Sequence, residues 1–270
     1  MDEVTPDLVN CEQDGAVLWL TLNRGRQRNP LSSQMIAALT ETLSAAYADD
    51  SVRVIVITAE GPVFSAGHDL KELHRTEDES VEAFRDRVTG ILESCARMMT
   101  GIVEAPKPVI ASVQGTATAA GCQLVSACDL AIAADTAHFC TPGVNVGAFC
   151  TTPLVGIGRN LSRKHAMEMA LTGDMFSAED AVGFGLINRH VPADRLRDET
   201  AALAAKIASR SAQSIRGGKA AFYAQVEMPL REAFTYANEV MLNGVTSGGD
   251  ATEGRQAFIE KREPRWDHSQ

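Results

Sequence analysis

The segment PVIASVQGTATAAGCQLVSACDLAIAAD (108–135) decides the fold. Its apolar run, Val109 to Val113, is rich in β-branched residues and ends at Gly115, which predicts a buried strand. A turn of small residues follows, and the apolar side chains after it recur at helical spacing up to Cys128. The free N–H groups at the start of that helix can face an anion or a polarised oxygen. A second strand, Leu130 to Ala134, comes next.

A similar strand-and-turn unit lies upstream, in RVIVITAEGPVFSAGHDL (53–70). An apolar strand leads through a Gly-Pro turn to a second small-residue turn, Phe64 to Leu70, and then to a helix-like segment. Two turns that each present free N–H groups can hold one carbonyl oxygen from two sides, which is the design of an oxyanion hole. We therefore predict that both turns contribute to one site.

Composition limits the classes of protein that the chain can belong to. The 270 residues are 45% hydrophobic and 22% charged, which favours one large domain, alone or with a helical appendage. A net charge of −10 argues against nucleic acid and anionic membranes as partners, and no apolar run has membrane-spanning length. The N-terminal residues resemble neither a signal nor a transit peptide. The six cysteines show no metal-ligand spacing, which predicts no metal site and reduced thiols in a cytoplasmic protein.

The remaining pattern alternates between strands and helices and ends in helices. We predict a strand at Val17 to Leu22, a helix capped by Ser32 or Ser33, and a strand at Val54 to Thr58. The charged stretch His74 to Glu82 reads as a mobile loop over the site. Further helices are expected at 81–103 and 163–173, a capping box at 177–180, a strand at 186–191, and tail helices at 193–209, 212–227, 229–244 and 251–261. This pattern by itself indicates an α/β fold.

The two turns resemble those of the crotonase (enoyl-CoA hydratase/isomerase) superfamily, and the resemblance runs from about Val17 to Arg262. It implies an α/β crotonase (ClpP-like) spiral of ββα units, with a core domain at 1–192 and a helical C-terminal region at 193–270. That region would build a trimer, often paired into a hexamer, and would contact coenzyme A. The resemblance also implies an enzyme of fatty-acid metabolism, a lyase or isomerase, with an acyl-CoA thioester as substrate and no permanently bound cofactor.

The resemblance assigns roles to individual residues. In the family, the F-x-A-G-x-D turn donates the N–H that corresponds to His68, and the Gly-rich turn donates the N–H that corresponds to Ala120. The family's hydratases carry glutamates where this chain has Gln123 and Gly143. Glutamine cannot take a proton and glycine has no side chain, so we predict slow hydration. Thr151 stands where some relatives carry an aspartate.

Three functions therefore stay open: an enzyme acting through an enolate-like state, a non-catalytic acyl-CoA binder or regulator, and a thioesterase-like hydrolase. The third would use a thiolate of Cys140 or Cys150, which flank the position of the missing base; both thiols can equally be buried apolar groups. Gln123 either bonds a water or the acyl chain, or fills space. The His68 ring need not face the site, because the backbone N–H suffices.

Coenzyme A phosphates require cations, and the chain offers several near the turns and at its C-terminal end. Arg24, Arg26 and Arg28 lie in the first turn, while Lys261 with Arg262 belongs to a run like the family's F-x-E-K-R tail. Asp69 is also a candidate cap for the segment that follows it. The predicted coenzyme A contacts are Arg28, Ala66, Asp69, Leu70, Lys71 and Lys261.

Overall fold

The computed structural model describes residues 7–267 and contains two sheets. The large sheet has the strand order β1-β2-β3-β5-β7-β10. Its strands are β1 (Val9–Asp14), β2 (Val17–Leu22), β3 (Val54–Ala59), β5 (Val109–Val113), β7 (Leu130–Ala134) and β10 (Arg189–Val191). β1 runs antiparallel to β2, and the other neighbours are parallel. The four central strands all lie where the apolar runs predicted them.

The small sheet consists of four short strands, three of which, β4, β6 and β8, each follow a strand of the large sheet. Its order is β4-β6-β8-β9, with β4 (Val63–Ser65), β6 (Thr116–Thr118), β8 (His138–Cys140) and β9 (Phe176–Ser177). β3 and β4 precede α2 (Val81–Val103), and β5 and β6 precede α3 (Ala120–Ala127). β7 and β8 precede η2 (Pro142–Val146) and α4 (Pro153–Asn160). Each unit thus gives one strand to each sheet before its helix, which is the predicted spiral of ββα units.

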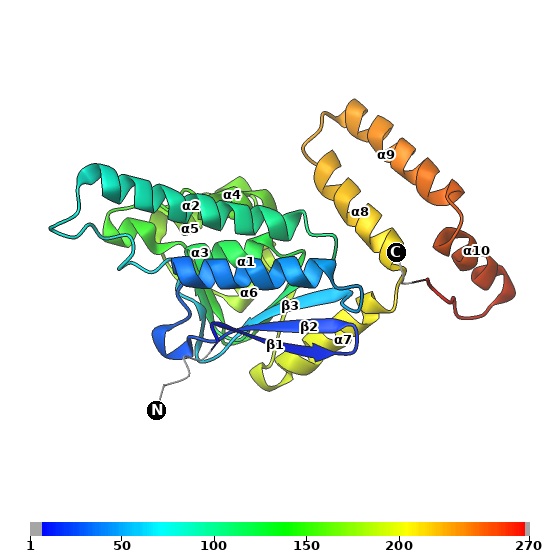
Figure 1. Cartoon of the computed structure of the whole chain (residues 1–270), viewed down its shortest axis with the longest axis horizontal. Coiled ribbons are helices and arrows are strands. Elements are labelled where there is room, and N and C mark those ends of the chain that lie inside the picture. The colour runs from blue at the N-terminus through cyan, green and yellow to red at the C-terminus, as the bar shows by residue number, and fades with distance from the viewer. Residues whose placement is uncertain (1–6, 268–270) are drawn as a thin grey trace.

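Helices cover both faces of the large sheet, which explains why β5 is buried throughout and β3 is buried at every position except Thr58. On one face, α1 (Ser33–Ala48) lies over the strands, and α2 packs on α1 and α3 (Figure 1). Ser32 caps α1 by accepting a hydrogen bond from Met35 N, and the buried face of α1 includes Leu39 and Leu43. On the other face, α7 (Leu196–Ala208) contacts β2, β3, β5 and β7, and its Ala204 packs beside Trp19.

The remaining helices follow the predicted order. α5 (Arg163–Thr172) ends at Gly173, and α6 (Ala178–Phe184) opens with the predicted capping box between Ser177 and Asp180. α8 (Ala212–Gln225), α9 (Leu230–Thr246) and α10 (Asp250–Glu260) project away from the sheets as a tail (Figure 1). The predicted boundary at residue 193 precedes α7, which packs on the large sheet, so the projecting part begins at α8. The boundary itself stays a prediction.

Three local predictions were wrong. The strand expected at 186–191 is confined to β10, because residues 186–188 turn so that Asn188 N can donate to Ala131 O at 2.9 Å. No helix follows His68: residues 69–80 form turns, and Asp69 Oδ1 accepts from Lys71 N at 2.9 Å, so Asp69 caps a turn. The loop expected from His74 to Glu82 ends at Ser80, which caps α2, and Arg87 ties it down through two hydrogen bonds to Glu79.

Candidate active site

The two small-residue turns lie against each other, because β4 and β6 are parallel neighbours. A Cβ atom built on Gly67 would lie 3.0 Å from Thr118 O and 3.1 Å from Ala120 N. A Cβ atom on Gly121 would lie 2.4 Å from Ser65 O. Only glycine permits this approach, and Gly67 also has a φ of +82° that side-chain-bearing residues disfavour. The structure therefore brings His68 and Ala120, the two predicted N–H donors, into neighbouring positions.

Within residues 7–267, neither predicted donor N–H has a backbone acceptor, although His68 forms an isolated parallel bridge with Leu31. Ala120 is the first residue of α3, so its N–H has no acceptor inside the helix. Ala119 holds the start of this helix in place: its N–H donates to Cys140 O at 2.9 Å, and its O accepts from Gln123 N at 3.0 Å. Ala119 also has a φ of +49°, an uncommon conformation for alanine. Their role as joint donors to one oxygen stays a prediction.

A buried asparagine braces the first turn, and the sequence did not reveal it as a support of the site. Asn29 is fully buried with a φ of +49°. Its Nδ2 donates to Glu60 O and Val63 O, both at 2.8 Å, and its Oδ1 accepts from Arg24 N at 2.8 Å. Ser65 Oγ donates to Asn29 O at 2.9 Å. An asparagine beside a proline was the available signal, but its distant partners Glu60 and Val63 were invisible in the sequence.

This brace places part of the predicted coenzyme A contacts beside the turn. Ala66 N donates to Arg28 O at 3.0 Å, so the arginine-bearing turn around η1 (Gly25–Gln27) lies against the turn that carries His68. Leu70 is 67% exposed, and Lys71 is also exposed. Arg28, Ala66, Asp69, Leu70 and Lys71 therefore occupy one neighbourhood. Their contact with coenzyme A remains a prediction.

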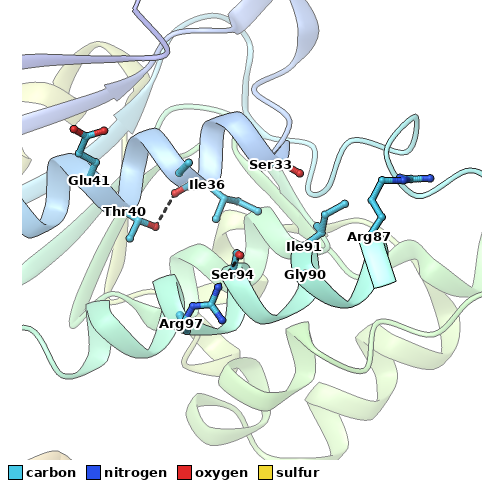
Figure 2. A pocket seen from close by; sticks show the side chains of 10 residues that line it. Ser33, Ile36, Thr40, Glu41, Arg87, Gly90, Ile91, Ser94 and Arg97 are labelled. Atoms are coloured by element: carbon cyan, nitrogen blue, oxygen red, sulfur yellow. Dashed lines mark hydrogen bonds between the residues drawn. The ribbon is translucent and has the colours of Figure 1, made fainter. Parts of the chain in front are cut away.

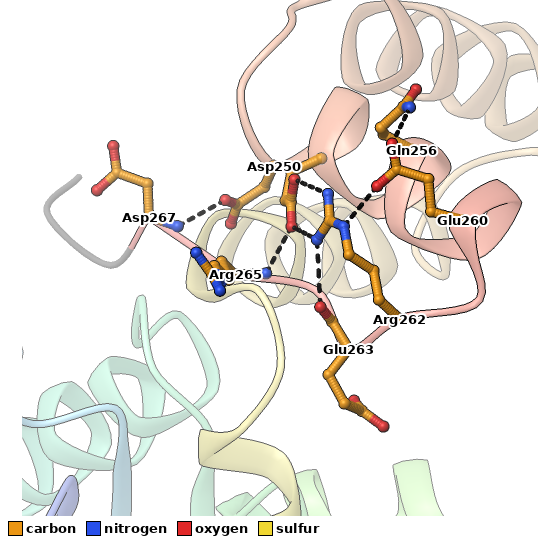
Figure 3. A network of polar contacts seen from close by, with 8 residues as sticks. Asp250, Gln256, Glu260, Arg262, Glu263, Arg265 and Asp267 are labelled. Atoms are coloured by element: carbon orange, nitrogen blue, oxygen red, sulfur yellow. Dashed lines mark hydrogen bonds and ion pairs between the residues drawn. The ribbon is translucent and has the colours of Figure 1, made fainter.

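Lys261, the sixth predicted contact, lies elsewhere. It is the C-terminal cap of α10, and α10 packs on α8 and α9 in the tail. The guanidinium of its neighbour Arg262 bonds both Glu253 and Glu260 at 2.6 Å, in the network that holds residues 265–267 against α10 (Figure 3). Within one chain, the tail carries Lys261 away from the two turns.

The His68 ring is held as a neutral imidazole. Its Nδ1 lies 3.2 Å from Leu31 O, and burial lowers the pKa of the ring. A neutral ring beside a carbonyl oxygen must place its proton on the nearer nitrogen, so Nδ1–H donates to Leu31 O. The other nitrogen, Nε2, is buried with no partner in the described part of the chain. It is an unprotonated acceptor.

Neither position of the missing carboxylates contains an acid, and the structure buries Gln123 and leaves Gly143 half-buried. Gln123 lies in the first turns of α3 and is 6% exposed, and its Oε1 has no partner among residues 7–267. Gly143 lies in η2, where a Cβ atom would be 3.0 Å from both N and Sγ of Cys150. Thr141, which precedes η2, is fully buried with Oγ1 unpartnered in the same described range. Since buried polar groups are normally paired, these oxygens are suited to hydrogen-bond a ligand or solvent.

The cysteines beside Gly143 are poor nucleophiles. Burial raises the pKa of Cys140 to about 11, with a smaller contribution from Cys150. Burial also raises the pKa of Cys150, and the Gly143 N–H opposes this only in part. A thiol reacts as its thiolate, so both groups are largely inert at neutral pH. All six cysteines of the chain are free.

Other features of the described residues do not add to this site. A cavity of about 630 Å³ lies between α1 and α2, lined by Ile36, Ile91 and Arg97 among others (Figure 2). It contains none of the predicted site residues and approaches their neighbourhood through Ser33, whose N and Oγ bond Glu72, and through Arg87, which donates to Glu72 O. Between residues 7 and 267, no three histidine, cysteine or acidic side chains gather in a way that could hold a metal. No helix in that range has the length and apolar character needed to cross a bilayer.

A spiral of ββα units in which two glycine-bearing turns meet defines the crotonase class of α/β proteins. A family model described as enoyl-CoA hydratase/isomerase matches residues 12–269. The chain belongs to the enoyl-CoA hydratase/isomerase family.

Individual relatives agree with this assignment. The mitochondrial enoyl-CoA hydratase domain-containing protein 3 of Rattus norvegicus is 43% identical over 266 residues, covering 98% of this chain and 86% of the relative. A putative enoyl-CoA hydratase of Thermus thermophilus is 35% identical over 94% of this chain and 98% of its own length. The crystal structure of human enoyl coenzyme A hydratase domain-containing protein 3 superposes with a TM-score of 0.91 at 41% identity, over 96% of this chain and 100% of that one.

Proposed function

We propose that the chain binds an acyl thioester of coenzyme A and holds the thioester oxygen between the N–H groups of His68 and Ala120. The observation that carries this proposal is the close approach of the two turns, with the Cβ position of Gly67 only 3.1 Å from Ala120 N. Donors aimed at an oxygen that gains negative charge stabilise an enolate, and losing one donor typically costs about 10²–10³ in rate. The proposed reaction class is chemistry at the carbons next to the thioester.

The same site is poorly equipped to hydrate an enoyl thioester. Hydration needs a base to activate water and an acid to protonate the α-carbon, and each such group contributes ~10²–10⁴ in rate. Gln123 and Gly143 supply neither. The neutral His68 ring has one free acceptor, Nε2, which makes it a titratable candidate in the turns, whereas the neighbouring Asp69 accepts from Lys71 N. We propose binding with slow turnover of crotonyl-CoA.

The test compares hydration of crotonyl-CoA by the parent, by Gln123→Glu, and by the double variant Gln123→Glu with Gly143→Glu. The loss of enoyl absorbance at saturating substrate measures turnover. We expect a clear gain only in the double variant, because the two carboxylates act on one water. Gln213→Glu on the exposed surface of α8 adds the same charge elsewhere and should change nothing.

The double variant carries a structural cost that must be measured. Gly143 has an ordinary φ, so backbone strain is not the obstacle. A glutamate there would instead press on Cys150 N and Sγ at 3.0 Å, and the loop would have to shift. A circular-dichroism melt of each variant therefore accompanies the rates. A parent that hydrates crotonyl-CoA at the rate of an ordinary hydratase would contradict the proposal.

A non-catalytic acyl-CoA binder is the second candidate, favoured by the absence of a carboxylate at positions 123 and 143. Tight binding of enoyl, dienoyl and malonyl-type thioesters, with no conversion of any, would support it. The raised pKa of both Cys140 and Cys150 argues against the cysteine thioesterase. Retained hydrolysis after alkylation of these thiols would exclude it.

We also propose that the chain works as a homotrimer or a dimer of trimers. The tail exposes large apolar side chains that water disfavours: Leu230 at 73%, Phe234 at 64%, Met241 at 68% and Phe258 at 85%. A neighbouring copy that covers this face would also allow its Lys261 to approach the turns. Light scattering at micromolar concentration measures the assembly, and a monomer would contradict it. The cytoplasmic location likewise stays a prediction, which cell fractionation tests.

A further inference from the structure

A small cavity of about 100 Å³ lies between the spiral and the tail. It lies where β3 and β5 begin, at the opposite end of these strands from the two turns. Its lining includes Arg53, which precedes β3, and Lys107, which precedes β5. The site turns follow the other ends of these parallel strands. Since a strand advances about 3.3 Å per residue and β3 has six residues, the cavity and the turns lie roughly 20 Å apart.

Four positively charged side chains and one acidic side chain line this cavity. Arg53 and Lys107 come from the spiral, and Arg210 and Arg216 come from the region where α7 gives way to α8. Asp50 is the acidic residue of the lining. The whole chain has a net charge of −10, so this local excess of positive charge runs against the character of the molecule. Four cations that converge beside a single acid repel one another, and a bound anion relieves that repulsion.

Three of the four cations have no partner in residues 7–267. No hydrogen bond or ion pair there involves the side chain of Arg53, Arg210 or Arg216. Lys107 is different: its Nζ donates to Ala46 O at 2.8 Å and to Asp49 O, which fixes the end of α1. Surface arginines without partners are ordinary, but Arg53 is half-buried, and its Nε is buried and unsatisfied.

Tyr47 supplies a second buried donor at the same place. Its hydroxyl is buried with no partner in the described range, and the residue lines the cavity. Burial, together with the charge of nearby Asp129, raises the pKa of Tyr47, so the hydroxyl keeps its proton and can donate. The start of α8 adds a backbone N–H donor to these side-chain donors. Ala212 is the first residue of α8 and lines the cavity, so its N–H has no acceptor inside the helix and favours an anion. Ile215 also lines the cavity, but its N–H already donates to Ser211 O.

We infer that this cavity is a binding site for a tetrahedral oxyanion, phosphate in the first place, either as the free ion or as the phosphate group of a monoester. Arg53 Nε and the Tyr47 hydroxyl form its floor, and Arg210 and Arg216 close it from the solvent side. Arginine matches phosphate geometry because its planar fork offers paired donors. The small volume admits the phosphate group alone, so any organic part would extend over the apolar rim of Ile207 and Pro106.

Binding would connect two parts of the chain. Arg53 and Tyr47 belong to the spiral, whereas Arg210 and Arg216 belong to the base of the tail. A ligand that binds the folded form alone stabilises it by mass action. Inorganic phosphate should therefore raise the melting temperature of the full-length protein in a saturable manner, at constant ionic strength, with chloride as the reference salt.

Calorimetric titration with inorganic phosphate, followed by thermal melts, tests the site directly. We expect one phosphate per chain, with affinity reduced at least tenfold in Arg53→Gln and in Arg216→Gln. Arg210→Gln changes an exposed residue without touching the core, so its loss of affinity does not depend on folding. Arg163→Gln, an exposed arginine at the start of α5 that also lacks a partner in residues 7–267, is the matched control and should bind normally.

Two further arms separate this site from the thioester site and from other anions. Phosphate should still bind to Lys261→Gln and to protein saturated with dephospho-coenzyme A, which lacks the phosphate monoester of coenzyme A; displacement by dephospho-coenzyme A would overturn the inference. Methyl phosphate that binds as well as phosphate would assign the pocket to monoesters, and exclusive binding of phosphate would assign it to the free ion. Equal binding of acetate, unchanged binding in the three arginine variants, or no saturable phosphate binding by the parent would each refute the site.

Discussion

Replacing Gly67 by alanine tests whether the contact between the two turns creates the site. The new Cβ would lie 3.0 Å from Thr118 O, 3.1 Å from Ala119 Cβ and 3.1 Å from Ala120 N. Unstrained contacts between such heavy atoms need about 3.5 Å or more, so the turns must separate by roughly 0.5 Å. A φ of +82° adds about 1–2 kcal/mol of backbone strain for alanine.

The expected loss of enolate stabilisation in Gly67→Ala follows from this separation of the turns. A misplacement of about 1 Å costs on the order of 10² in rate, and a shift of half that size should cost about tenfold to a hundredfold. This corresponds to ~1.4–2.7 kcal/mol of enolate stabilisation. Gly248→Ala is the matched control, because Gly248 has a φ of +80° and no atom within 4 Å of the Cβ position. Both variants carry the backbone strain, and only Gly67→Ala separates the turns.

The assay titrates each protein with acetoacetyl-CoA, whose enolate absorbs in the near ultraviolet. We expect Gly67→Ala to lose affinity for the enolate by the stated factor, while Gly248→Ala binds as the parent does. Thermal melts should show that both variants are destabilised and that Gly67→Ala is the less stable of the two. Equal enolate affinity in both variants would refute the reasoning, because the approach of the turns would then have no role in holding the oxygen.

Three further perturbations have defined outcomes. Asn29→Ala removes three hydrogen bonds of 2.8 Å and should lower the free energy of unfolding by roughly 3 kcal/mol, as measured by urea denaturation. A loss below about 1 kcal/mol would show that the Asn29 brace is dispensable. Asp129→Asn breaks the buried 2.7 Å ion pair with Lys219 and should lower the free energy of unfolding by ~3–5 kcal/mol. The double variant Asp129→Asn with Lys219→Met should recover part of this loss. No recovery would show that Asp129 acts through its other bonds, to Val109 N and the Tyr223 hydroxyl. Arg262 lowers the pKa of Glu253 from 4.5 to about 2, so this carboxylate stabilises the tail end above pH 4.5 and loses that effect as the pH falls towards 2. Fluorescence of Trp266, which donates to Ser209 O, should report the release, and an identical pH profile in Glu253→Gln would contradict the assignment.

The sequence predicted the long elements of the fold because each has its own local signal. β3 and β5 are continuous apolar runs, and α1 and α6 begin at serine caps. β1 was missed because five of its six residues are exposed at an edge, so no alternation marks it. The small sheet was missed because its strands have only two or three residues, too few for a period to emerge.

The candidate site was predictable to the extent that its chemistry resides in short motifs. The turns at His68 and Ala120, and the replacements at Gln123 and Gly143, follow from the resemblance alone. The support from Asn29 was not predictable, because its partners Glu60 and Val63 are distant in the chain. The cationic cavity was not predictable either, since Arg53, Lys107, Arg210 and Arg216 meet only after the sheet and the tail have formed. The predicted helix after Asp69 failed because an aspartate can cap a turn as readily as a helix.

The two proposed oxygen donors are main-chain groups, and this determines how the site can be mapped and how it can change. An alanine scan would leave Ala120 untouched, and His68→Ala would keep the N–H that matters. Such a scan would report an almost silent site. Only substitutions that alter backbone shape or delete an amide would expose it, such as added bulk at Gly67 or an ester link at position 120. The side chains around the donors are correspondingly free to change, so one scaffold can exchange its acid and base residues without rebuilding the place where the oxygen is held.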